Sequence, residues 1–108
     1  MHHSNVADFA SHRAAARQAD SVRIAQAIAA ADWDTEACFD LGVVYSTGAS
    51  GVASDLIEAH MWFNLAAARG HEEAADMRAE IADEMSAREI AEAQRRARQW
   101  LASQRKAA

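Results

Sequence analysis

The chain has 108 residues, a formal net charge of −5 and a single cysteine. This length suits one domain, and one cysteine excludes an intramolecular disulfide or a cysteine-rich metal site. The acidic balance argues against nucleic-acid binding. Because the sequence shows neither a signal-peptide core nor an apolar run of membrane length, we expect a cytoplasmic protein that does not bind membranes.

The composition favours helix along almost the whole chain. Alanine supplies 29 of the 108 residues and proline is absent, and alanine has the highest helix propensity. Val, Ile, Leu, Met, Phe and Trp together number only 24, so we expect a thin core in which alanines let helices approach closely. The predicted fold class is all-α. Arginine outnumbers lysine ten to one, a bias that suggests a bacterial source.

The N-terminal part of the chain has the weakest pattern. Residues 1–18 are expected to be weakly structured or to form a frayed helix, and a single helical domain then spans residues 19–104. Its first helix is predicted at residues 20–31. A second helix is predicted at residues 35–47, with Asp34 as its N-cap.

A loop with two glycines separates this helix from the next. Gly48 stands where a helix often ends in a left-handed residue, and Ser54 or Asp55 is expected to cap a helix at residues 55–69. That helix carries apolar residues on two roughly opposite sides, so it should lie between other helices.

Two more helices are predicted after Gly70. Residues 72–84 open with two glutamates, and residues 86–104 open with Ser86 and Glu89 at the spacing of a capping box. Residues 72–94 carry eight acids and two arginines, whereas residues 95–108 carry five bases and no acid. Acids early and bases late in a helical region suit the helix dipole.

The sequence contains an internal repeat. Residues 29–37, AAADWDTEA, and residues 66–74, AAARGHEEA, are identical at five of nine positions with an offset of 37 residues. A period of this length is typical of stacked helical hairpins, each of which buries its apolar face against its neighbours.

The spacing of apolar and small residues in this region is specific. The pattern comprises two loop glycines, a valine after them, and a Trp-Phe-x-x-Ala-Ala-x-x-Gly run. Its positions are Ala37, Leu41, Gly42, Tyr45, Gly48, Gly51, Val52, Asp55, Ala59, Trp62, Phe63, Ala66, Ala67, Gly70 and Ala74. It resembles the Sel-one-like repeat, a relative of the tetratricopeptide repeat. The resemblance implies an α-solenoid of about five helices in which these positions are structural, and the family has no shared catalytic residues to carry over.

The flanking segments depart from this pattern. Trp33 stands where a preceding repeat would have glycine, and Arg78-Ala79 stand where Leu41-Gly42 would recur. We therefore expect one full repeat, residues 37–74, between partial units, with the helices at 72–84 and 86–104 as C-terminal caps. The concave surface should be short.

The resemblance also implies a function, because proteins of this family are mostly described as adaptors that bind other proteins on the concave face. That face is expected on the first helix of each hairpin, at Phe39, Asp40, Val43, Glu73, Asp76, Glu80 and Asp83. An apolar patch beside an acidic stripe would suit a basic, amphipathic peptide. The alternative is a solvated acidic face, with Phe39 and Val43 covered by the N-terminal helix.

Two other classes of function remain open, a structural protein and an enzyme. A thin core and exposed ends of the helical stack would suit a structural protein that forms homo-oligomers. An enzyme is disfavoured, because Cys38 lies on the packing side without an obvious histidine partner. Neither His60 nor His71 has a second ligand at metal-binding spacing, so no metal or cofactor is predicted. Trp33 and Trp100 are expected either to close an end of the stack or to anchor a partner.

Overall fold

The computed structural model describes residues 22–27, 29 and 33–107, and every regular element among them is helical. After a helical segment at residues 22–27, the elements are α2 (Thr35–Thr47), the short 3-10 turn η1 (Ala49–Gly51), α3 (Leu56–Ala68), α4 (Glu72–Ala82) and α5 (Ala87–Ala107). The all-α fold class is confirmed. Residues 1–18 lie outside the described residues, and so do residues 20, 21, 28, 30 and 31 of the helix predicted at 20–31.

The helix starts follow local side-chain chemistry. The Asp34 carboxylate accepts hydrogen bonds from the backbone N–H groups of Glu36 and Ala37, at 2.9 and 3.1 Å. Asp55, rather than Ser54, caps α3 in the same way. Each carboxylate satisfies N–H groups that have no partner inside the helix.

The capping box at the start of α5 is present. The Ser86 hydroxyl accepts from the Glu89 N–H at 3.1 Å, and the Glu89 carboxylate accepts from the Ser86 N–H at 2.8 Å. The helix extends beyond the predicted end at residue 104, whereas α4 stops at Ala82, two residues before its predicted end.

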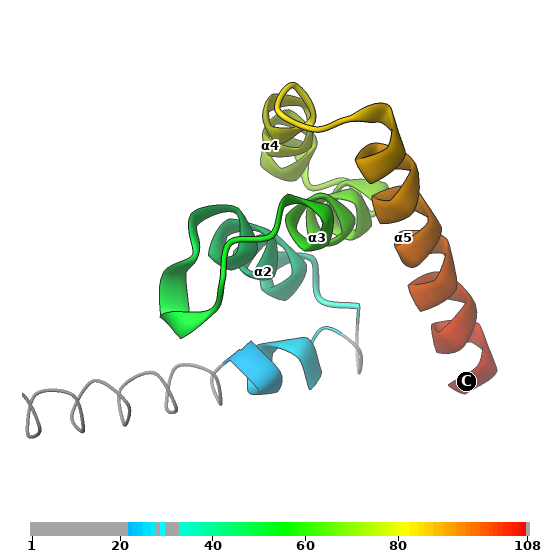
Figure 1. Ribbon diagram of the computed structural model, residues 1–108. Helices are drawn as coiled ribbons and strands as arrows, with labels where there is room; N and C mark the ends of the chain where they lie inside the picture. The colour runs from blue at the N-terminus through cyan, green and yellow to red at the C-terminus, as the bar shows by residue number, and fades with distance from the viewer. Residues whose placement is uncertain (1–21, 28, 30–32, 108) are drawn as a thin grey trace, which may run out of the picture.

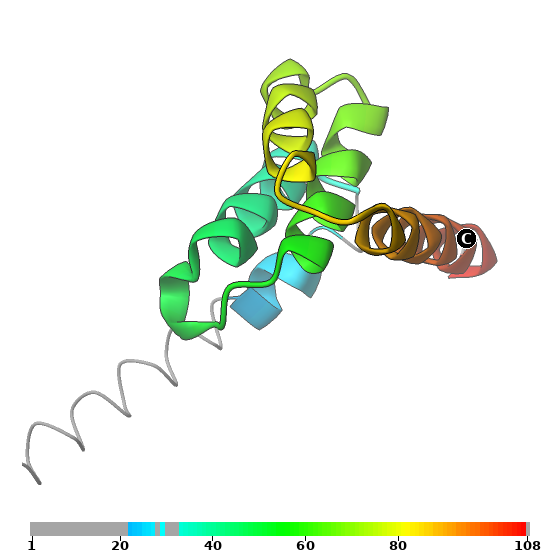
Figure 2. The same cartoon turned by 45° about the horizontal axis from the view of Figure 1, so that its top comes forward.

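Helix α3 is the centre of the described fold. It packs against α2, α4 and α5 (Figures 1 and 2), and it lies between α2 and α5 in both views. Its buried residues occupy both sides of the helix, as predicted: Ala59, His60, Met61, Trp62, Phe63, Leu65 and Ala66.

The α2–α3 hairpin depends on one close approach. Gly42 is buried on α2, and a Cβ placed there would overlap the ring of Phe63 on α3. After α2, the backbone reverses through Gly48, Ser50 and Gly51, all with positive φ, and the Asp55 N–H then donates to the Tyr45 carbonyl at 2.8 Å. This hydrogen bond fixes the loop against the end of α2.

Three tryptophans join the segment just before α2 to α3 and α5. Trp33 and Trp62 each lie edge-to-face with Trp100, with ring centroids 6.0 Å apart in both pairs. The Trp33 indole N–H donates to the Leu65 carbonyl at 3.0 Å. Trp33 and Trp100 therefore meet at one place on α3 instead of closing separate ends of the stack.

A polar network ties α5 to α3 beside this aromatic cluster. Arg96 lies 3.2 Å from the Glu58 carboxylate and 2.8 Å from that of Glu92, and the Trp62 indole N–H donates to Glu58. Hydrogen bonds from Arg95 and Arg96 lower the pKa of Glu92 to about 2. Within the described residues, the search for a helix both long and apolar enough to cross a membrane finds none.

Candidate interaction surface

The predicted site residues of α2 do not all lie together. Phe39 is half-buried: its ring stacks on His71, with centroids 4.5 Å apart and planes 13° apart, and it also contacts Phe63 at 5.7 Å. Val43, one turn later, is also half-buried against the core. Both residues thus lie on the side of α2 that meets the start of α4.

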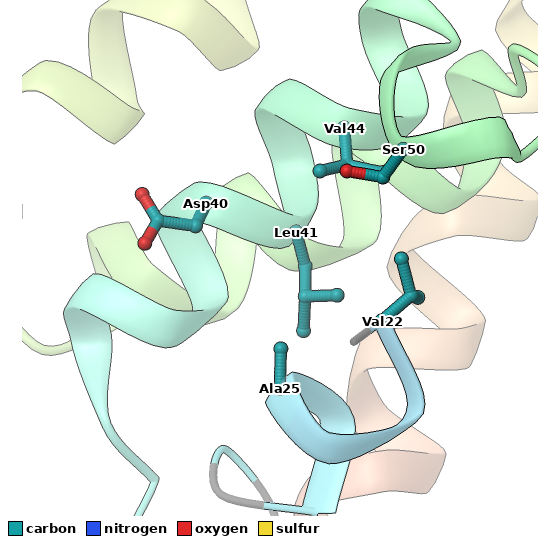
Figure 3. Close-up of a pocket in the computed structure, with 6 residues that line it drawn as sticks. All are labelled: Val22, Ala25, Asp40, Leu41, Val44 and Ser50. Carbon is teal, nitrogen blue, oxygen red and sulfur yellow. The ribbon is translucent and has the colours of Figure 1, made fainter. Parts of the chain in front are cut away.

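Asp40 lies on another side of α2, toward residues 22–27. It lines a pocket of about 150 Å³ together with Val22, Ala25, Leu41, Val44 and Ser50. In Figure 3, Leu41 and Ala25 point toward each other, while the Asp40 carboxylate points outward at the rim. Burial, followed by the charges of Glu36 and Asp34, raises the pKa of Asp40, and His71 opposes this shift.

The segment at residues 22–27 covers the side of α2 that carries Leu41 and Val44. Its Val22 side chain is buried near Leu41 and Val44, and the Gln26 amide donates to the Tyr45 hydroxyl at 2.9 Å. The N-terminal helix expected at residues 1–18, the alternative cover for Phe39 and Val43, lies outside the described residues. Among the described residues, the aromatic rings that cover Phe39 are those of Phe63 and His71.

His71 is a structural residue that sequence reasoning missed. Its Nδ1 accepts the Ala74 N–H at 3.1 Å, so it is the N-cap of α4. Because Nδ1 is an acceptor, the proton is assigned to Nε2, which donates to the Glu36 carboxylate at 2.9 Å. One imidazole thus joins α2 to α4. The sequence feature that could have indicated this role is the position of His71 directly before Glu72-Glu73, where α4 begins.

Three of the four predicted acidic residues lie on α4 and the fourth is its C-cap. We call the four the acidic stripe: Glu73, Asp76, Glu80 and Asp83. All four are exposed, and none forms an ion pair within the part of the chain that the structure describes. Met77, between them in sequence, is half-buried against the core. The stripe is therefore a free acidic surface with an apolar edge.

Two titratable side chains of the described residues, Cys38 and His60, are buried in the core. Burial, with a smaller contribution from Asp34, raises the pKa of the Cys38 thiol to about 11, which disfavours the thiolate needed for nucleophilic chemistry. Burial and the nearby Arg78 lower the pKa of His60, whose Nδ1 has no hydrogen-bond partner. The described residues contain no cluster of three or more His, Cys, Asp or Glu side chains suited to a metal ion.

Comparison with known proteins finds a match over the central hairpin. Residues 35–71 match the family model of the Sel1 repeat, which covers α2, η1, α3 and the N-cap of α4. No curated protein and no solved structure gives a significant match to the chain.

Proposed function

Because the chain carries a Sel1 repeat at residues 35–71, a helical repeat that generally mediates protein–protein interaction, we propose that it is a non-enzymatic adaptor module that binds a protein segment. No cofactor or metal takes part. The observation that carries the proposal is the free acidic stripe of α4 next to half-buried apolar side chains.

The proposed binding surface, here called the α2–α4 face, has an apolar part and a charged part. Phe39 and Val43 supply the apolar part on α2, and Met77 adds to it on α4. His71 connects the two helices, since it stacks on Phe39 and begins α4 two residues before Glu73. Asp40 is proposed only as a peripheral contact, at the edge of this face.

The chemistry of this face defines its ligand. Four unpaired carboxylates attract lysine or arginine, and exposed apolar edges take aliphatic side chains, so the best ligand is a basic, amphipathic helix. Exposed charges are screened by salt, with a Debye length of about 10 Å at 0.1 M and about 3 Å at 1 M. Binding should therefore weaken steeply as the ionic strength rises.

A synthetic helical peptide of leucine and lysine, with leucines at i, i+3 and i+4 spacing, serves as the probe. Its affinity is measured by fluorescence anisotropy. We expect saturable binding to the natural chain and a loss of about tenfold or more in the variant Asp76→Lys with Glu80→Lys, because two attractive charges become repulsive.

Two controls accompany this measurement. Ala49→Lys with Ala53→Lys changes exposed positions in the loop between α2 and α3. It changes the net charge in the same direction and should leave the affinity within about twofold of that of the natural chain. A peptide in which glutamate replaces lysine should not bind. Equal affinity of the Asp76→Lys, Glu80→Lys variant and the natural chain would refute the proposed face.

A further inference from the structure

Helix α5 carries a basic surface that the functional proposal does not use. Arg88, Arg95 and Arg98 are all exposed, and we call them the basic stripe. Arg95 is held by Glu92 at 2.6 Å. Arg88 and Arg98 form no ion pair within the described residues. The intervening Ala91 is small and exposed, so another helix could approach this surface closely.

The basic stripe and the acidic stripe have the same spacing. Arg95 and Arg98 follow Arg88 by seven and ten residues, and Glu80 and Asp83 follow Glu73 by seven and ten residues. At 1.5 Å per residue, each stripe is about 15 Å long. Two helical surfaces with equal charge spacing can pair along their whole length.

The two stripes do not neutralise each other within one chain. Helix α5 packs on α3 through the buried Ala93 and Ala97 and the half-buried Trp100 and Leu101, which directs the arginines outward. Figure 1 places α4 above α3, whereas most of α5 runs along another side of it. Since no ion pair joins α4 to α5 among the described residues, each stripe is available to another molecule.

We propose that a second copy of the chain is a ligand of the α2–α4 face, with the basic stripe of one copy on the acidic stripe of the next. This inference rests on the proposed function, and it names the partner: the exposed basic side of α5, which the chain itself supplies. Each copy has one stripe of each sign, so the contact is heterologous and leads to rings or open chains. Charged surfaces associate weakly in water, so the assembly should depend on concentration and salt.

The test exchanges the charges of the two stripes. One variant carries Glu73→Arg, Glu80→Arg and Asp83→Arg, which leaves Asp76 as the single acid of that stripe and makes both of its stripes net basic. The other carries Arg88→Glu and Arg98→Glu, which makes both of its stripes acidic and leaves the Arg95, Arg96 and Glu92 network intact. Circular dichroism verifies folding, and sedimentation velocity across concentrations measures association.

The natural chain should associate as its concentration rises at low salt, and should be monomeric at about 1 M NaCl, where the Debye length is about 3 Å. Each variant alone should remain monomeric, and an equimolar mixture of the two should associate again, because each acidic stripe then meets a basic one. Ala49→Arg with Ala53→Arg adds charge in the loop between α2 and α3, outside both stripes, and should associate like the natural chain.

Two results would overturn the inference. One is a natural chain that stays monomeric at every concentration. The other is association that persists in both variants or fails to return in the mixture. If the leucine–lysine peptide still binds in an Asp76- and Glu80-dependent way, the proposed function stands without the second copy. If neither peptide nor second copy depends on these acids, both proposals fail.

Discussion

At the residue scale, a few backbone positions decide how the central hairpin closes. Gly42 allows Phe63 to lie against the α2 backbone, and Gly48 ends α2 in the left-handed region with φ of 77°. Ser50 adopts a positive φ despite its side chain. Such conformations cost L-residues about 1–2 kcal/mol, so the loop depends on the glycines beside it.

Gly51→Val should lower the free energy of unfolding by about 1–2 kcal/mol, because Gly51 has φ of 77° and a β-branched side chain is strained there. Urea unfolding followed by circular dichroism measures the loss. Gly51→Asn is the matched control and should lose less, since asparagine tolerates this conformation. An unchanged midpoint for the valine variant would contradict the role assigned to Gly51.

At the scale of the elements, α5 is attached to α3 by aromatic packing and by one charged network. Trp100 contacts Trp33 and Trp62, while Arg96 bridges Glu58 and Glu92. Exposed ion pairs contribute little, whereas edge-to-face aromatic pairs add about 0.5–1.5 kcal/mol beyond the area they bury. The tryptophans should therefore dominate the attachment of α5.

Trp100→Ala should lower the free energy of unfolding by about 2–4 kcal/mol. This is less than the usual loss of about 3–5 kcal/mol for a fully buried aromatic residue, because Trp100 is only half-buried. It should also speed tryptic cleavage after Arg98, since α5 would detach more often. Gln99→Ala, at the exposed neighbouring position, should change neither quantity appreciably. Equal cleavage rates in the two variants would show that Trp100 does not hold α5.

At the scale of the whole molecule, stability should depend on the charge state of His60, which is 3 % exposed in the α3 core. Its folded pKa is lowered by burial and by Arg78, so the neutral form is favoured in the native state. The unfolded chain takes up the proton near pH 6.5. The contribution of His60 to the free energy of unfolding is therefore fully present above about pH 6.5, and it is lost progressively as the pH falls from that value toward the lower folded pKa.

We expect the free energy of unfolding of the natural chain to fall between pH 7.5 and 5 by up to about 1.4 kcal/mol per pH unit from this residue. His60→Leu also removes the unpartnered Nδ1, and its free energy of unfolding should vary less over the same range. Groups present in both proteins, such as Asp40 with its raised pKa, contribute to both curves, so the difference between the curves reports on His60. Parallel pH curves for the two proteins would contradict this role of His60.

The sequence by itself determined the all-α class, the existence of the hairpin and most helix boundaries. Alanine content favours helix residue by residue. Caps such as Asp34 and Asp55, and the Ser86–Glu89 box, join groups only a few residues apart along the chain, so local sequence patterns reveal them. The Trp-Phe run and the loop glycines revealed the repeat that the family model also finds.

Only the tertiary structure decided which distant residues meet. Trp33 and Trp100 pack together although 67 positions separate them, and His71 binds Glu36 and Phe39 across the hairpin. Asp40 lies apart from Phe39 because one step along a helix turns the side chain by about 100°, from 3.6 residues per turn. The periodicity of apolar residues predicts which side of each helix faces the core. The angle at which the helices pack decides which exposed sides lie on one surface.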